Sequence, residues 1–156
     1  MTQINSYGRM YEYIQNFDEP TILIFFGDHL PYLYNAEYQK DVTQFLTYFN
    51  TGNSLLDTYR KYNTQCLILA NFDLGNVENM NYLSADTLLT SVLNNMGLEL
   101  SDYYVWLYNN KNKLPSSNFI VSQDVDGNLF WTNKLDGEKK EYFNEREKIQ
   151  YNFLKR

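Results

Sequence analysis

The chain has 156 residues, which is enough for one domain with a single hydrophobic core. Hydrophobic residues make up 44% of it and charged residues 21%, as in folded globular proteins rather than disordered ones. The net charge of −6 and the scattered Lys and Arg residues exclude the electrostatic footprint of a nucleic-acid-binding protein.

The aromatic content is high, at 17%, mainly because of 15 Tyr. Two explanations stay open: rings at half-exposed core edges or on a covered surface, and a composition biased by an AT-rich genome. The sequence shows neither a transmembrane stretch nor a signal peptide, so the chain alone is expected to be cytoplasmic.

Along the first third, apolar side chains at helical spacing predict a helix over residues 3–17, which ends before Pro20. The unbroken apolar run of residues 21–26 then predicts a strand buried on both faces, as in parallel sheets covered by helices. A loop follows to about Asn35, and residues 36–48 are expected to be helical.

In the middle of the chain, a turn at residues 51–53 precedes a short helical piece over residues 54–61. Residues 66–72 predict a second buried strand. Cys66, the only cysteine, begins this strand, so we expect it to be a small buried hydrophobe.

The last part begins with a helix over residues 85–96, with Ser84 as its cap and Gly97 as its stop. Its expected inner face comprises Leu88, Leu89, Val92, Leu93 and Met96. A second helix starts at Ser101, with Tyr104, Leu107 and Tyr108 inward. Residues 119–122 and 129–132 flank Asp126-Gly127 and predict a hairpin, and an amphipathic helix over residues 137–154 ends the chain, with Tyr142, Ile149 and Phe153 on one stripe.

Two acidic segments have ordinary structural interpretations. Residues 124–128, Asp-Val-Asp-Gly-Asn, are similar to a calcium loop, but the Gly comes too early for EF-hand spacing and no closing Glu is in place. We therefore expect the hairpin turn there. The charge run of residues 138–141 is typical of a solvated helix face.

This order of elements predicts an α/β fold, with a small C-terminal β-hairpin and a final helix. Two strands are too few for a free-standing parallel sheet, so the sheet is expected to be part of a larger one.

Asp28 and His29 are the best candidates for chemistry. They follow the first strand directly, and the carboxyl ends of strands in open α/β sheets are where ligands bind. A carboxylate oxygen and an imidazole nitrogen are usual ligands of zinc- and manganese-type ions, although an Asp at this place can also simply cap a turn. Asp73 closes the second strand and is expected either to cap a turn or to face the same sheet edge.

The longer string around this pair, Phe-Phe-Gly-Asp-His-Leu-Pro over residues 25–31, resembles the late metal-ligand motif of the sulfatase-like, lipoteichoic acid synthase-type phosphoglycerol transferases of the alkaline phosphatase superfamily. Residues 62–73 look like that family's following strand, although Gln65 stands where the family often has Pro. Residues 83–97 look like its next helix and residues 100–104, Leu-Ser-Asp-Tyr-Tyr, like its next segment. The resemblance covers most of residues 12–108.

The resemblance implies a partial alkaline-phosphatase/sulfatase-like sheet covered by helices. Residues 1–115 would be the C-terminal part of the sulfatase-like domain, and residues 116–156 a β-hairpin plus a C-terminal helix packed on it. It also implies one catalytic ion, commonly Mn²⁺, held by an early Glu, a Thr nucleophile and the Asp28–His29 pair. The Glu and the Thr have no counterpart in residues 1–27, so this chain supplies two metal ligands and no catalytic nucleophile.

Two functions follow as hypotheses. The first is the C-terminal fragment of a metal-dependent enzyme that transfers phosphoglycerol or hydrolyses phosphate or sulfate esters of the cell envelope. This fragment would be inactive alone, and the missing N-terminal part of the enzyme or a complementary chain would complete it. Its substrate would be a phosphoglycerol lipid or another phosphate or sulfate ester, and the parent family is membrane-anchored with an extracellular catalytic domain. The second is a non-catalytic α/β binding or assembly module derived from that fold. An independent hydrolase is disfavoured, because one His without a placed nucleophile makes no catalytic constellation.

Overall fold

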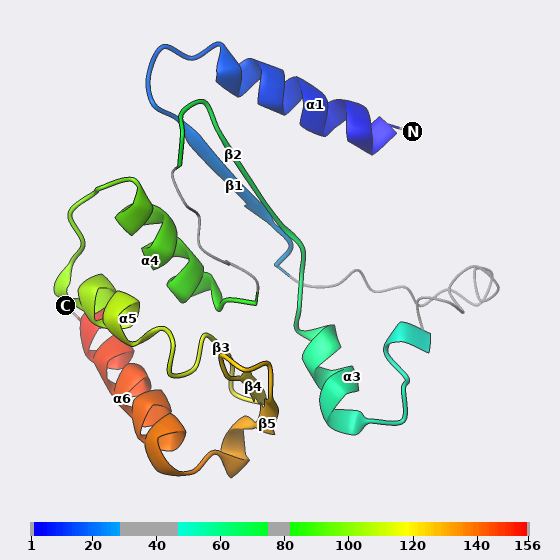
Figure 1. Ribbon diagram of the computed structural model, residues 1–156, viewed down its shortest axis with the longest axis vertical. Coiled ribbons are helices and arrows are strands. Elements are labelled where there is room, and N and C mark those ends of the chain that lie inside the picture. Colours follow the sequence, from blue (N-terminus) through cyan, green and yellow to red (C-terminus); the bar gives the residue numbers. More distant parts are fainter. Residues whose placement is uncertain (1, 29–46, 75–81, 156) are drawn as a thin grey trace.

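A computed structural model describes residues 2–28, 47–74 and 82–155. In chain order the elements are α1 (Thr2–Gln15), β1 (Ile22–Phe26), α3 (Ser54–Lys61), β2 (Cys66–Ala70), α4 (Ala85–Asn95), α5 (Asp102–Asn110), β3 (Ser116–Ser117), β4 (Val121–Gln123), β5 (Leu129–Trp131), the 3₁₀ turn η2 (Thr132–Lys134) and α6 (Gly137–Leu154) (Figure 1). The helix expected over residues 36–48 lies outside the described residues, except for its last two positions.

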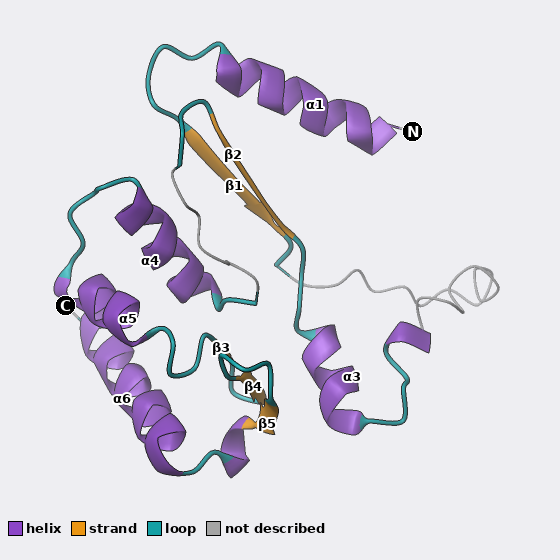
Figure 2. Cartoon of the chain, viewed as in Figure 1, coloured by secondary structure: helices purple, strands orange, loops and turns teal. Residues whose placement is uncertain are grey.

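The chain mixes helices with two small sheets, so the α/β class is confirmed, together with the C-terminal hairpin and the final helix (Figure 2). One sheet is the β1–β2 ribbon, and the other has the order β3-β4-β5. In the described part of the chain, no helix is both long and apolar enough to cross a membrane.

The β1–β2 ribbon corrects the expected parallel arrangement. The two strands pair with each other antiparallel, in a register that sets Ile22 opposite Ala70 and Phe26 opposite Cys66. An apolar run predicts that both faces of a strand are apolar, but it does not specify the direction of the neighbouring strand.

The expected burial of both strands is also wrong. None of their ten residues is buried, and the side chains of Phe25 and Phe26 are 46% and 53% exposed. Cys66 is likewise exposed, against the expectation of a buried thiol. Within the described ranges the ribbon has two strands, which are too few to cover two apolar faces.

Helix α1 and the following turn hold one end of the ribbon. The side-chain amide of Gln15 donates to the Ala70 carbonyl at 2.8 Å, on the outer edge of β2. Asn71, just past β2, accepts from the Thr21 N–H at 2.7 Å and donates to the carbonyls of Phe17 and Glu19 at 3.0 and 2.9 Å. One side chain therefore fixes the turn that leads from α1 into β1.

The C-terminal half contains the largest part of the core. Leu114, Leu135 and Tyr142 form a buried cluster, against which Trp106 on α5 packs. The Trp106 and Tyr142 rings stack with centroids 5.3 Å apart and planes 11° from parallel. Helix α5 thus lies between α4 and α6, and it contacts both.

The boundaries of α4 and α6 agree with those predicted from local sequence signals. α6 spans the predicted residues, and α4 ends one residue before the predicted position, with Gly97 at φ +68°. Ser84 is the N-cap residue, but its hydroxyl makes no capping bond. Instead it accepts from the Ser117 N–H at 2.9 Å and donates to the Ser117 carbonyl at 3.1 Å, joining α4 to β3.

The inner face of α4 differs from the prediction. Its buried residues are Thr87, Thr90, Ser91 and Val92, whereas Leu89 is 37% exposed. Thr90 and Ser91 donate their hydroxyls to carbonyls one turn earlier, at 2.9 Å each. Small side chains that satisfy their own polar groups in this way can pack closely, which hydrophobic periodicity alone does not reveal.

Candidate functional site

The pairing of β1 with the chain before β2 continues past the end of β1 and positions the candidate metal ligand. The Gly27 N–H donates to the Gln65 carbonyl at 3.3 Å, and the Thr64 hydroxyl donates to the Gly27 carbonyl at 2.6 Å. Asp28 follows directly and is exposed. Both the N–H and the C=O of Gly27 are therefore hydrogen-bonded, and Asp28 follows at the end of a fixed strand.

The other sequence-predicted site residues do not gather there. His29 lies outside the described residues. Asp73 follows β2, so in an antiparallel ribbon it stands at the opposite end from Asp28, with five residue pairs between. Five pairs correspond to about 17 Å, which excludes the alternative that Asp73 faces the same sheet edge as Asp28.

The donor set at the end of β1 is small. Within residues 2–28, 47–74 and 82–155, no three His, Cys, Asp or Glu side chains converge on a position that could hold a metal ion. The Asp28 carboxylate suits Mn²⁺ or Zn²⁺ chemically, but one described ligand does not make a site. An ion at this place would need His29 and further ligands.

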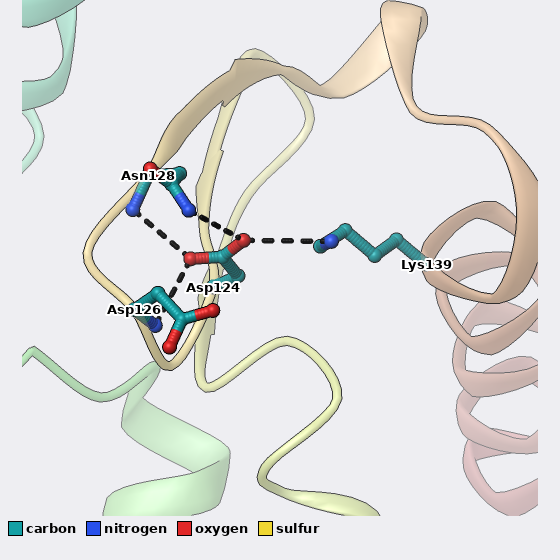
Figure 3. Close-up of polar contacts among 4 residues, drawn as sticks. All are labelled: Asp124, Asp126, Asn128 and Lys139. Atoms are coloured by element: carbon teal, nitrogen blue, oxygen red, sulfur yellow. Dashed lines mark hydrogen bonds and ion pairs between the residues drawn. The ribbon is translucent and has the colours of Figure 1, made fainter.

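The acidic loop at residues 124–128 is the hairpin turn, as predicted (Figure 3). The Asp124 carboxylate accepts from the N–H of Asp126 at 3.1 Å and from the N–H of Asn128 at 2.9 Å. Lys139 on α6 pairs with its second oxygen at 3.4 Å. Gly127 takes the left-handed conformation of the turn, with φ +83°. The carboxylate is thus used to close the turn.

The charge state of Asp124 follows from these contacts. Burial by itself raises the pKa of this carboxyl, but the backbone and side chain of Asn128, the Lys139 ammonium and the Asp126 N–H outweigh burial and hold the pKa below its usual value. Asp124 is therefore ionised at neutral pH and ties the hairpin to α6.

The sequence did not indicate a cavity that the described residues form. A cavity of about 800 Å³ opens between α3, the start of β2 and the β4–β5 turn. Its described lining includes Tyr48, Tyr59, Arg60, Gln65, Tyr82 and Gln123. These residues come from four separate parts of the chain, and no local motif joins them. The only available signal was the high Tyr content.

This cavity borders the end of β1. Thr64 and Gln65 line it, and they are the residues that hydrogen-bond Gly27, next to Asp28. Cys66 also lines it. Although the residue is exposed, partial burial of its sulfur raises the pKa of the thiol, which is therefore protonated at neutral pH. The cavity and the candidate metal ligand are thus connected through Thr64 and Gln65.

Comparisons of the chain with protein-family models, with curated proteins and with solved structures found no match. Membership of the sulfatase-like family therefore stays a prediction from residues 25–31 and the segments that follow them.

Proposed function

We propose that this chain is the C-terminal part of a metal-dependent, sulfatase-like enzyme of the phosphoglycerol transferase type, and that it contributes Asp28 and His29 as two ligands of a divalent ion. Mn²⁺ is the proposed ion. Its chemistry would be to lower the pKa of a hydroxyl nucleophile and to neutralise charge on a phosphate or sulfate ester. The nucleophile and the remaining ligands would come from the missing N-terminal part or from a complementary chain.

The observation that carries this proposal is the position of Asp28 directly past the end of β1. The carboxylate is exposed, and Gly27 before it is anchored to Thr64 and Gln65. A ligand on a fixed strand end needs little ordering when the metal binds.

The edge of β1 that faces away from β2 gives independent support to this proposal. The bond from Asn71 N–H to the Thr21 carbonyl and the bond from Gly27 N–H to the Gln65 carbonyl fix which residues face the partner strand. By alternation, Ile22, Ile24 and Phe26 direct their backbone N–H and C=O groups away from β2. Among the described residues no other strand pairs with this edge of β1. An edge of this kind between two apolar faces is typical of a strand that belongs inside a larger sheet.

Thermal unfolding with and without MnCl₂ tests the metal ligands. At a Mn²⁺ concentration equal to its Kd, binding to the folded chain alone raises its stability by about 0.4 kcal/mol. We expect that rise in the wild type, its loss in Asp28→Asn and His29→Ala, and its retention in Asp73→Asn at the other end of the ribbon. An equal rise in all four proteins would rule out Asp28 and His29 as ligands.

A second candidate is a non-catalytic binding or assembly module derived from the same fold. It is favoured by the core of the C-terminal half, where Leu107, Leu114, Val121, Leu135 and Tyr142 are all buried. A monomer that unfolds in one step and does not respond to Mn²⁺ would favour this module over the enzyme part.

A further inference from the structure

The cavity beside α3 is lined by rings and amides rather than by charges. Tyr48, Tyr59 and Tyr82 contribute aromatic rings, and Asn63, Gln65 and Gln123 contribute amides. Arg60 is the one charged residue in its described lining. A second cavity, of about 400 Å³, shares Tyr82 and Gln123 with the first. The second cavity is a separate one, whose described lining also includes Lys111 and Asp124, and the proposal concerns the first cavity alone.

Tyr82 has an unusual backbone conformation. Its φ of +62° is left-handed, and it is the one residue other than Gly with positive φ in the described part of the chain. A side chain there costs about 1–2 kcal/mol relative to Gly. The ring is nevertheless 61% exposed, so core packing does not require it. A strained backbone that presents an exposed ring to a cavity indicates a binding role for that ring.

The polar groups of the cavity are already oriented. The Tyr59 hydroxyl donates to Gln123 Oε1 at 2.6 Å, and Gln123 Nε2 donates to the Gly127 carbonyl at 3.3 Å. The Arg60 guanidinium lies 4.1 Å from the centre of the Tyr48 ring and donates to the Tyr48 carbonyl at 2.6 Å. A guanidinium has five N–H donors, so this bond leaves others for a ligand. Because these side chains are fixed before binding, a ligand orders few of them.

These features match a sugar. A pyranose ring has apolar C–H faces that pack on aromatic rings, and its hydroxyls both donate and accept hydrogen bonds, as amide side chains do. A nucleotide would bring at least one phosphate to a site with one cation, in a chain of net charge −6. The lining therefore favours a neutral or weakly acidic ring with several hydroxyls.

We propose that this cavity binds a carbohydrate, with the sugar ring stacked on Tyr82 and its hydroxyls bonded to Gln123, Gln65 and Arg60. Thr64 and Gln65 connect the cavity to Gly27 and Asp28, so the sugar would be the non-reacting part of an ester whose phosphate or sulfate lies at Asp28. This last link rests on the proposed function. Carbohydrate binding by the cavity does not.

Saturation-transfer NMR on the full chain tests the proposal, with maltotriose and triacetylchitotriose as sugar probes and AMP as the competing ring. We expect one of the two sugars to bind with a Kd of about 1 mM, and Tyr82→Ala to weaken it by about tenfold. Tyr82→Phe keeps the ring and should bind like the wild type. Tyr151→Ala removes a ring of similar exposure, 58%, outside the cavity, and should also bind like the wild type.

Two results would overturn the proposal: no transfer to either sugar, whether or not AMP binds, or equal affinity in Tyr82→Ala and the wild type. Far-UV circular dichroism of Tyr82→Ala checks that the variant is folded. If it is not, Gln65→Ala, which removes a proposed sugar contact, should weaken binding instead, and unchanged binding in that variant would overturn the proposal. The Mn²⁺ titration is read separately. Sugar binding without a Mn²⁺ response would keep the carbohydrate site and reject the metal ligands, and a Mn²⁺ response without sugar binding would do the reverse.

Discussion

The side-chain oxygen of Asn71 accepts a hydrogen bond from the Thr21 N–H at 2.7 Å, across fifty positions of sequence. The Asn71 N–H in turn donates to the Thr21 carbonyl at 3.2 Å, so the two residues are paired in both directions. This pair closes the ribbon at the end opposite Asp28. The register of β1 against β2, and with it the position of Asp28, therefore depends partly on a residue in the Asn-Phe-Asp segment after β2.

Replacing Asn71 by Asp should destabilise the fold by about 2 kcal/mol, because two donated hydrogen bonds are lost and a carboxylate faces the Phe17 and Glu19 carbonyls. Urea denaturation at constant m-value measures the change. Asn109→Asp, at an exposed position on α5, is the matched control and should change stability by less than about 0.5 kcal/mol. Equal losses in the two variants would show that the Asn71 amide does not hold the ribbon.

Asp124 should make stability depend on acid pH. The folded-state pKa of its carboxyl lies below the ordinary value, so its stabilising effect is complete above the unfolded-state pKa of about 4 and is lost as the pH falls through the folded-state value. We expect the free energy of unfolding to drop below about pH 4. In Asp124→Asn the neutral-pH stability should be lower and the acid-induced drop shallower.

The control for this titration is Asp126→Asn, which keeps the backbone bond from residue 126 to Asp124. Its acid-induced drop should match that of the wild type. If Asp124→Asn loses stability in acid as steeply as the wild type does, protonation of the Asp124 carboxylate does not cause the acid-induced drop in the free energy of unfolding.

The predictions that succeeded rest on local chemistry. Gly97 stops α4 and Gly127 turns the hairpin, because positive φ suits glycine within a few residues of chain. The predictions that failed concern partners distant in sequence. The antiparallel direction of β2 and the exposure of Cys66 depend on which strand lies beside which, and an apolar run carries no such information.

The same distinction holds for the site. Asp28 at the end of a strand could be predicted, because the preceding apolar run fixes where the strand stops. The cavity could not, since the packing of α3 against β4 and β5 brings Arg60 and Gln123 together, and Tyr82 joins them from a third part of the chain. The left-handed Tyr82 also has no sequence signal, because Gly, Asn and Asp are the residues expected there.

Substitution by Ala should raise the stability of the chain at one glycine and lower it at another. Gly8 lies inside α1 with no atom within 4 Å of an added Cβ, so Gly8→Ala should stabilise the chain by roughly 0.5–1 kcal/mol through helix propensity. Gly127 has φ +83° and equally open surroundings, with the nearest atom 3.9 Å from an added Cβ. Gly127→Ala should therefore destabilise the chain by about 1 kcal/mol through backbone strain alone. Urea midpoints of the two variants against the wild type measure the difference. No gain of stability in Gly8→Ala would mean that α1 does not form part of the cooperatively folded unit, and a gain in Gly127→Ala would rule out backbone strain at that position.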